Sequence, residues 1–184
     1  MVLSRATIAS AFVLALFSLG VLAGCGNDEE QGVDEPAREG LALELDDVTY
    51  TVFITRQLNT AIPPDNDYYS GPDPGKGQTL YGVFIQACNH TSEVQKTTGL
   101  FAVKDSLHNE FLPVTLPSDN PFAYHVRELK PEECIPESGS PAQLGPAAAS
   151  MLLFKLPVEN TENRPLELEI QGDGLNKLTF ELDV

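Results

Sequence analysis

Basic residues are scarce in this chain. Its 184 residues include 11 lysines and arginines against 27 aspartates and glutamates, for a formal net charge of −16. Because proteins that bind nucleic acid neutralise phosphates with lysine and arginine, this composition excludes nucleic acid as the partner. Anionic lipid headgroups would be repelled for the same reason. We expect the acidity to serve solubility and spacing from a surface, the alternative being binding of a cation or a basic partner.

Catalytic motifs are absent from the sequence as well. It has no Gly-x-Ser-x-Gly nucleophile turn and no Cys-x-x-Cys redox pair. His90, His108 and His125 lack the i,i+4 spacing of a zinc-binding helix. Glu132-Glu133 lies in a polar loop, where water would keep both carboxylates ionised instead of tuning one as an acid and one as a base. We therefore expect a protein that is not an enzyme and needs no metal or diffusible cofactor.

Helical periodicity longer than one turn is also missing, whereas apolar and polar residues alternate in several short segments. The strands predicted from this pattern cover residues 48–55, 79–89, 100–103, 111–112, 122–129, 151–156, 166–171 and 178–182. In the first strand, Val48, Tyr50, Val52 and Ile54 are expected to share the buried face, and the second strand is apolar on both faces. About seven short strands separated by turns are typical of an all-β, antiparallel β-sandwich.

One loop, residues 59–77, is long and rich in proline, glycine and aspartate. Long loops within a compact domain are usually either functional or disordered. This one contains Tyr68 and Tyr69, and aromatic side chains in an exposed, proline-restrained loop are common anchors for a partner. We place the expected partner-binding loop here. The alternative is that both rings pack back onto the sandwich.

The same loop carries the candidate ion sites. Asp65-Asn66-Asp67 could begin a calcium loop, but Ser70 stands where that motif requires glycine. Residues 71–77 look like a phosphate-binding loop, but their spacing differs and their prolines lack the N–H groups that hold phosphates. We predict no metal site, with Asp65 and Asp67 as the candidates for an irregular calcium site if one exists.

The chain begins with a long uncharged run. It follows Arg5, extends from Ala6 to Gly24 and ends in the sequence Val-Leu-Ala-Gly before Cys25. A transmembrane helix is one interpretation, since about 20 residues span a bilayer. Polar and small residues within the run, and acidic residues after it, favour a cleaved leader.

The end of this run resembles the lipobox of bacterial lipoproteins. The resemblance implies that residues 1–24 are a signal peptide that is removed and that Cys25 carries a covalent diacylglycerol. It also implies that the lipid holds the protein at the extracytoplasmic face of the cell membrane. Residues 26–40 contain six acidic residues and only one large aliphatic residue, Val33. We predict that residues 25–40 form a disordered acidic linker and that residues 41–184 form one folded domain.

With Cys25 assigned to lipid, Cys88 and Cys134 remain as an even pair outside the cytoplasm, where disulfides persist. We predict a disulfide between them, the alternative being two buried free thiols. Cys88 shares one face of its strand with Leu80 and Phe84. We therefore expect the loop that carries Cys134 to cover these two residues.

Three further segments are informative together: the strand and asparagine-containing turn at residues 85–91, the hairpin at 103–111, and the turn and strand at 144–157. They resemble the telokin-like, immunoglobulin-fold domain of unknown function found in many Gram-positive lipoproteins. The resemblance covers about residues 48–184. It implies an immunoglobulin-like sandwich with an extracytoplasmic accessory role and no catalytic residues, and this chain departs from it in the 59–77 loop and the loop around Cys134.

These observations predict a lipid-anchored, non-enzymatic binding module of the cell envelope, whose partner is an unidentified envelope protein or ligand. The alternatives are an accessory subunit of an envelope transporter or enzyme, and a calcium-binding surface protein.

Overall fold

The structure is a computed structural model that describes residues 35–184. The predictions for residues 1–24, for Cys25 and for most of the linker therefore lie outside the described residues. Within residues 35–184, no helix is long and apolar enough to cross a membrane.

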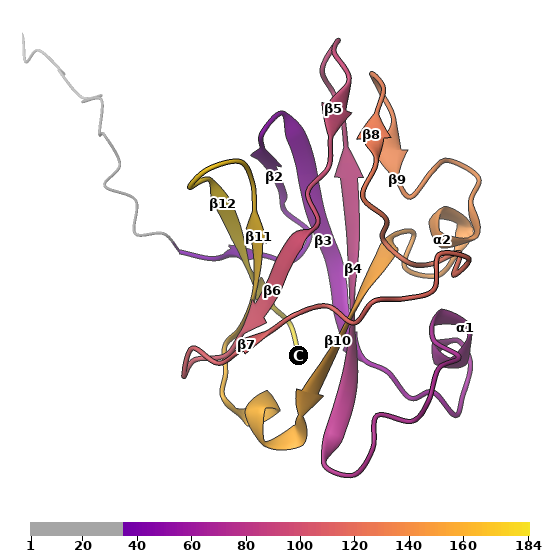
Figure 1. Cartoon of the computed structure of the whole chain (residues 1–184), viewed down its shortest axis with the longest axis vertical. Coiled ribbons are helices and arrows are strands. Elements are labelled where there is room, and N and C mark those ends of the chain that lie inside the picture. Colours follow the sequence, from indigo (N-terminus) through magenta and orange to yellow (C-terminus); the bar gives the residue numbers. More distant parts are fainter. Residues whose placement is uncertain (1–34) are drawn as a thin grey trace, which may run out of the picture. The chain divides into compact units, whose positions relative to one another are not determined.

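The described chain forms an all-β sandwich, as the alternating segments predict (Figure 1). The first sheet has the order β1 (Ala37–Arg38), β12 (Lys177–Leu182), β11 (Leu166–Gln171), β6 (Leu100–Lys104) and β7 (Glu110–Phe111). The second has the order β10 (Ser150–Pro157), β4 (Gln78–Cys88), β3 (Val48–Gln57) and β2 (Ala42–Leu45), with β9 (Cys134–Ile135) also paired to β4. A separate two-stranded ribbon joins β5 (Gln95–Lys96) to β8 (Glu128–Leu129). All strand pairs are antiparallel except β1 with β12.

The main core lies between the two large sheets. Alternate residues of each long strand point into it, because successive side chains of a strand lie on opposite faces. Val83 and Ile85 of β4, Phe154 of β10 and Leu168 of β11 are completely buried there. The predicted alternation in β3, β4, β11 and β12 is thus confirmed for most of its length.

A second apolar cluster covers the outer face of the second sheet. Leu80 and Phe84 of β4 lie in it, as do Met151 and Leu153 of β10. The expectation that both faces of β4 need cover is confirmed. Figure 1 shows the two short helices, α1 (Asp65–Tyr68) and α2 (Pro141–Leu144), on this side of the molecule.

The cover differs from the prediction. Tyr68, in α1, packs edge-on against Phe84 and Phe122, with ring centroids 4.8 and 5.0 Å apart. It is the 59–77 loop and the segment near Phe122 that cover Leu80 and Phe84, not the loop that carries Cys134. The disulfide pairs neighbouring strands, so it holds the Cys134 segment beside β4 and not across its face.

Two further expectations are corrected. Ile54 is 43% exposed because a β-bulge shifts the register of β3 after Val52, so the period-two pattern breaks at Phe53. Of residues 122–129, only Glu128 and Leu129 form a strand. The preceding residues pass from β10, where Phe122 and Tyr124 bond to Met151, to Thr97, which bonds to Arg127.

The folded domain also begins earlier than the predicted boundary at residue 41. Ala37 and Arg38 pair with β12, and Gly40 donates a backbone hydrogen bond to the carbonyl of Val52. The Glu39 carboxylate accepts hydrogen bonds from the N–H groups of Thr55 and Asp183. The end of the segment predicted to be a disordered linker is therefore part of the sheet, because backbone pairing does not require apolar side chains.

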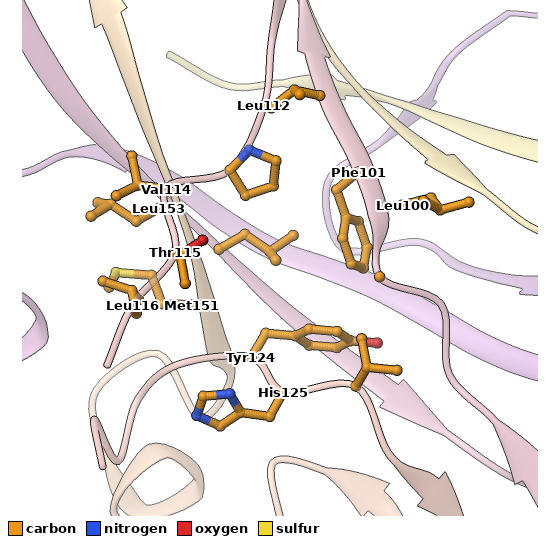
Figure 2. Close-up of a pocket in the computed structure, with 14 residues that line it drawn as sticks. Leu100, Phe101, Leu112, Val114, Thr115, Leu116, Tyr124, His125, Met151 and Leu153 are labelled. Carbon is orange, nitrogen blue, oxygen red and sulfur yellow. The ribbon is translucent and has the colours of Figure 1, made fainter. Parts of the chain in front are cut away.

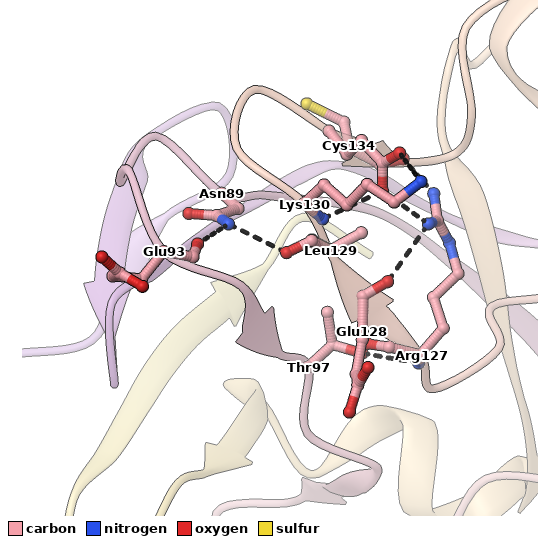
Figure 3. A network of polar contacts seen from close by, with 9 residues as sticks. Asn89, Glu93, Thr97, Arg127, Glu128, Leu129, Lys130 and Cys134 are labelled. Atoms are coloured by element: carbon pink, nitrogen blue, oxygen red, sulfur yellow. Dashed lines mark hydrogen bonds and ion pairs between the residues drawn. The ribbon is translucent and has the colours of Figure 1, made fainter.

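Cys88 and Cys134 form a disulfide, as predicted, with Cα atoms 4.1 Å apart. Next to it lies a polar network (Figure 3). The backbone N–H of the fully buried Asn89 donates to the carbonyl of Glu133, and its carbonyl accepts from the N–H of Glu132. Arg127 donates a 2.8 Å hydrogen bond to the Cys134 carbonyl. This network fixes the turn after β4 and the start of β9.

Candidate functional site: an apolar groove between the sheets

The candidate site lies where the chain crosses from one sheet to the other. After β7 ends at Phe111, the chain leaves the edge of β6 and reaches β10, where the N–H of Val114 donates to the carbonyl of Leu153. It returns to β10 further on, where Met151 bonds to Phe122 and Tyr124 through their backbone groups. The two crossings leave an opening between β6 and β10.

This opening is a groove of about 410 Å³. Figure 2 shows Phe101 on one side of it and Val114 and Leu116 on the other, with Met151 and Leu153 of β10 beside the latter. None of the residues that line the groove is an aspartate, glutamate, lysine or arginine, and His125 contributes an imidazole. Three apolar residues at the groove are well exposed: Leu100 (58%), Leu112 (66%) and Val126 (47%).

Tyr124 lies at one end of the groove, and contacts with Phe101 and Thr98 fix its position. Its ring packs edge-on against Phe101 with centroids 5.1 Å apart, and its hydroxyl donates to the carbonyl of Thr98. The N–H of Thr98 in turn donates to the hydroxyl of Tyr50. Burial raises the pKa of Tyr124 above its ordinary value. The hydroxyl is therefore a neutral structural group, and the ring presents an apolar surface to the groove.

Gly99 marks the place where two segments of the groove wall come close together. A Cβ atom at this position would lie 2.8 Å from Cγ2 of Val126. Real Cβ atoms do not approach another atom so closely, so a larger residue would displace Val126. The glycine is thus required by the approach of the 124–126 segment to the start of β6.

One edge of β6 is open at the groove. β7 pairs only with Val103 and Lys104 of β6. Before Gly99, Thr97 is already paired, because its N–H and its hydroxyl both donate to the carbonyl of Arg127. Within residues 35–184, no strand continues the sheet beside residues 100–102. A sheet edge left open next to apolar side chains is a surface on which another chain can pair.

A second, polar pocket of about 460 Å³ adjoins the groove and shares Gly99, Leu100 and Val126 with it. Its charged lining residues are Asp46, Asp173 and Lys96, all exposed. The Asp46 carboxylate accepts hydrogen bonds from the N–H of Asp173 and from the side-chain amide of Asn176. A carboxylate has about four acceptor positions, so Asp46 retains capacity for a further donor.

The residues predicted as sites lie elsewhere. Tyr68 is 2% exposed and belongs to the second core cluster, so the prediction that it anchors a partner in an exposed loop is wrong. Tyr69 is half-buried, and its hydroxyl donates to the carbonyl of Pro72 within the same loop. Both rings pack against the apolar residues on the outer face of the second sheet, which would otherwise be exposed to water. This is the alternative that the sequence left open.

Asp65 is likewise a structural residue. It is buried, its Oδ1 pairs with the guanidinium of Arg56 at 2.7 Å, and its Oδ2 accepts from the N–H of Asn59 at 2.7 Å. Asp67 is exposed and is not grouped with other ligand residues. No cluster of three or more histidine, cysteine, aspartate or glutamate side chains suited to a metal ion occurs among residues 35–184.

Two other buried carboxylates are used within the fold. Burial by itself raises the pKa of Asp105, but hydrogen bonds from the side chains of Asn109, Asn160 and Asn163 outweigh it and hold the pKa below its ordinary range. Burial also raises the pKa of Glu169, yet bonds from Lys177, Gln171 and Lys104 lower it to about 2. Both carboxylates stay ionised at neutral pH and tie neighbouring segments together.

The exposed residues at the groove were not identified from the sequence. The available signal was that Leu100 and Leu112 are large apolar residues at the two outer ends of a predicted hairpin. The position of a leucine in a hairpin does not show whether it is buried or exposed, because the sequence does not show where the chain crosses between the sheets.

No family profile matches the sequence, and no curated protein does. Among solved structures, the chain is similar to the yjhA protein from Bacillus subtilis, with a TM-score of 0.50 and 10% identity over 80% of this chain and 99% of that one. It is also similar to ycdA, a provisionally assigned lipoprotein from Bacillus subtilis, with a TM-score of 0.50 and 10% identity over 77% of this chain and 38% of that one. At this level of identity the likeness concerns the fold.

Proposed function

We propose that this protein is a lipid-anchored, non-enzymatic binding module at the extracytoplasmic face of the cell membrane, of the telokin-like immunoglobulin type, and that it holds an envelope protein in the groove between β6 and β10. The observation that carries this proposal is the set of exposed apolar residues Leu100, Leu112 and Val126 at an uncharged groove. Contiguous exposed apolar surface next to a concave site marks a binding surface.

The anchoring part of the proposal rests on the lipobox-like sequence that ends at Cys25. It is supported by the similarity of fold to ycdA, a provisionally assigned lipoprotein. Two acyl chains on one cysteine would hold the protein stably on a membrane.

The absence of enzymatic activity is part of the same proposal. The groove offers mainly aliphatic and aromatic surface, and its lining includes the His125 side chain. The buried carboxylates Asp65, Asp105 and Glu169 are bonded within the fold, so they hold structure instead of exchanging protons with a substrate. Such a lining favours retention of a partner.

The proposal is tested by crosslinking in intact cells with a groove variant, Leu100→Ser with Leu112→Ser. The control is Leu144→Ser with Leu175→Ser, which replaces two leucines that are 73% and 99% exposed and do not line the groove. We expect the groove variant to lose its crosslinked envelope partner and the control to keep it. Retention of the partner by the groove variant overturns the binding role of the groove.

The anchor is tested separately. Cys25→Ala should leave the precursor uncleaved by the lipoprotein signal peptidase and unlabelled by radioactive palmitate, whereas the wild type should take up label. Acyl label on the Cys25→Ala protein, or a mature terminus at another residue in the wild type, contradicts the anchor.

A further inference from the structure

We propose that the groove recognises an extended, positively charged segment of its partner protein, which pairs with the open edge of β6 and places a basic side chain in the adjoining pocket. This inference rests on the proposed function of the groove and adds the chemistry of the occupant. It is carried by three neighbouring features: an edge of β6 that no strand continues beside residues 100–102, an apolar groove and a pair of carboxylates.

The strand edge provides the backbone contact. The β7 strand already pairs antiparallel with one end of β6, at Val103 and Lys104, and stops because the chain turns away toward β10. A strand from the partner could pair with residues 100–102, in line with β7 along the same edge of β6. In this mode of binding the main-chain hydrogen bonds supply affinity, and pockets for alternate side chains supply specificity.

The groove defines one set of those side chains. Successive residues of an extended segment point to opposite sides, so every second residue would face between the sheets. There it would meet Phe101, Tyr124 and Leu153, which are apolar surfaces. Aliphatic or aromatic residues at alternate positions suit this lining.

The polar pocket defines the charge. Asp46 and Asp173 line it together with one cation, Lys96, so its charged groups sum to a net negative charge next to Leu100. The whole chain, with its formal net charge of −16, adds a field of the same sign. A lysine or arginine of the partner would therefore be attracted both at long range and within the pocket. The same charges repel anionic lipid headgroups, which disfavours a membrane surface as the occupant.

The test uses the mature lipoprotein in phosphatidylcholine nanodiscs, because detergent would compete for the groove and anionic lipid would bind a basic peptide. The probe is a nine-residue peptide that alternates valine with lysine. Its matched control alternates valine with glutamate. Binding is measured by fluorescence anisotropy, and hydrogen exchange reports on the amides of residues 100–102.

We expect the lysine peptide to bind and to slow exchange of those amides of residues 100–102 that point away from β11, since alternate N–H groups of a strand face opposite edges. Its binding should weaken as salt is raised, whereas the glutamate peptide should not bind. Asp173→Asn should weaken binding about two- to fivefold, as for an exposed ion pair. Leu100→Ser with Leu112→Ser should weaken it at least about tenfold, since burying a leucine is worth ~1.5–3 kcal/mol. The Leu144→Ser, Leu175→Ser control should bind like the wild type.

Equal binding of the two peptides, or binding without protection of residues 100–102, overturns the inference. So does binding of a neutral aliphatic alcohol such as decanol in the groove when the lysine peptide does not bind. If these results are obtained while the in-cell crosslink still depends on Leu100 and Leu112, the proposed binding function stands and only the assignment of the occupant fails.

Discussion

The side-chain amide of Asn89 donates a buried 2.9 Å hydrogen bond to the carbonyl of Leu129, 40 residues later in the chain (Figure 3). The same amide donates to the carbonyl of Glu93, and its oxygen accepts from Thr91. One side chain thus joins the end of β4 to the β5–β8 ribbon. The chain after β5 leads through Gly99, which lines the groove, into β6, so the network positions one boundary of the groove.

Asn89→Ala should destabilise the domain by about 1–3 kcal/mol, because it leaves buried backbone carbonyls without a donor. The free energy of unfolding in urea measures the loss. Asn66→Ala, which changes an exposed asparagine in α1, is the control and should have a much smaller effect. Equal stability of Asn89→Ala and the wild type would contradict the role of the network.

Reduction of the Cys88–Cys134 disulfide should lower the melting temperature. The bond closes a sequence separation of 46 residues, which corresponds to about 4 kcal/mol on the chain-entropy model. For a domain of this size the expected decrease is about 8–16 °C. The variant Cys88→Ser with Cys134→Ser should melt near the reduced wild type and should no longer respond to reductant. Calorimetry with and without reductant gives both values, and two titratable thiols in unreduced, unfolded protein would contradict the bond.

Tyr68 and Tyr69 should differ sharply on substitution although they are adjacent. Tyr68→Ala removes a buried ring that contacts Phe84 and Phe122, and should cost about 3–5 kcal/mol. Tyr69→Ala removes a half-buried ring and should cost clearly less. Denaturant unfolding of both variants makes the comparison. A loss of partner binding by Tyr68→Ala without a loss of stability would restore the exposed-loop hypothesis.

Stability should fall in acid because of Glu169. Its pKa is lowered to about 2 in the folded protein from an ordinary value of 4.5, so unfolded chains bind its proton first as the pH falls. The stabilisation is therefore complete above about pH 5 and is lost as the pH drops through 4.5 toward 2. Melting temperatures measured from pH 7 to pH 2 should show this decrease, and Glu169→Gln should start lower at pH 7 and fall less steeply. An identical acid slope in Glu169→Gln would exclude this contribution.

The sequence by itself determined the strands whose apolar residues alternate strictly. In β11, Leu166, Leu168 and Ile170 are buried as their spacing predicts, because the two-residue repeat of a strand fixes which side chains share a face. It also predicted the disulfide between Cys88 and Cys134, which the structure confirms. The first feature depends on the local geometry of a strand and the second on the number of cysteines, and a single sequence shows both.

The tertiary structure decided which apolar residues became core and which became surface. Tyr68 is buried because the outer face of β4 and β10 needs cover, whereas Leu100 and Leu112 are exposed because the chain leaves β6 and crosses to β10 beside them. In each case the outcome depends on a partner far away in the sequence. Periodicity records the face of a strand on which a residue lies, but burial depends on what the rest of the chain places against that face.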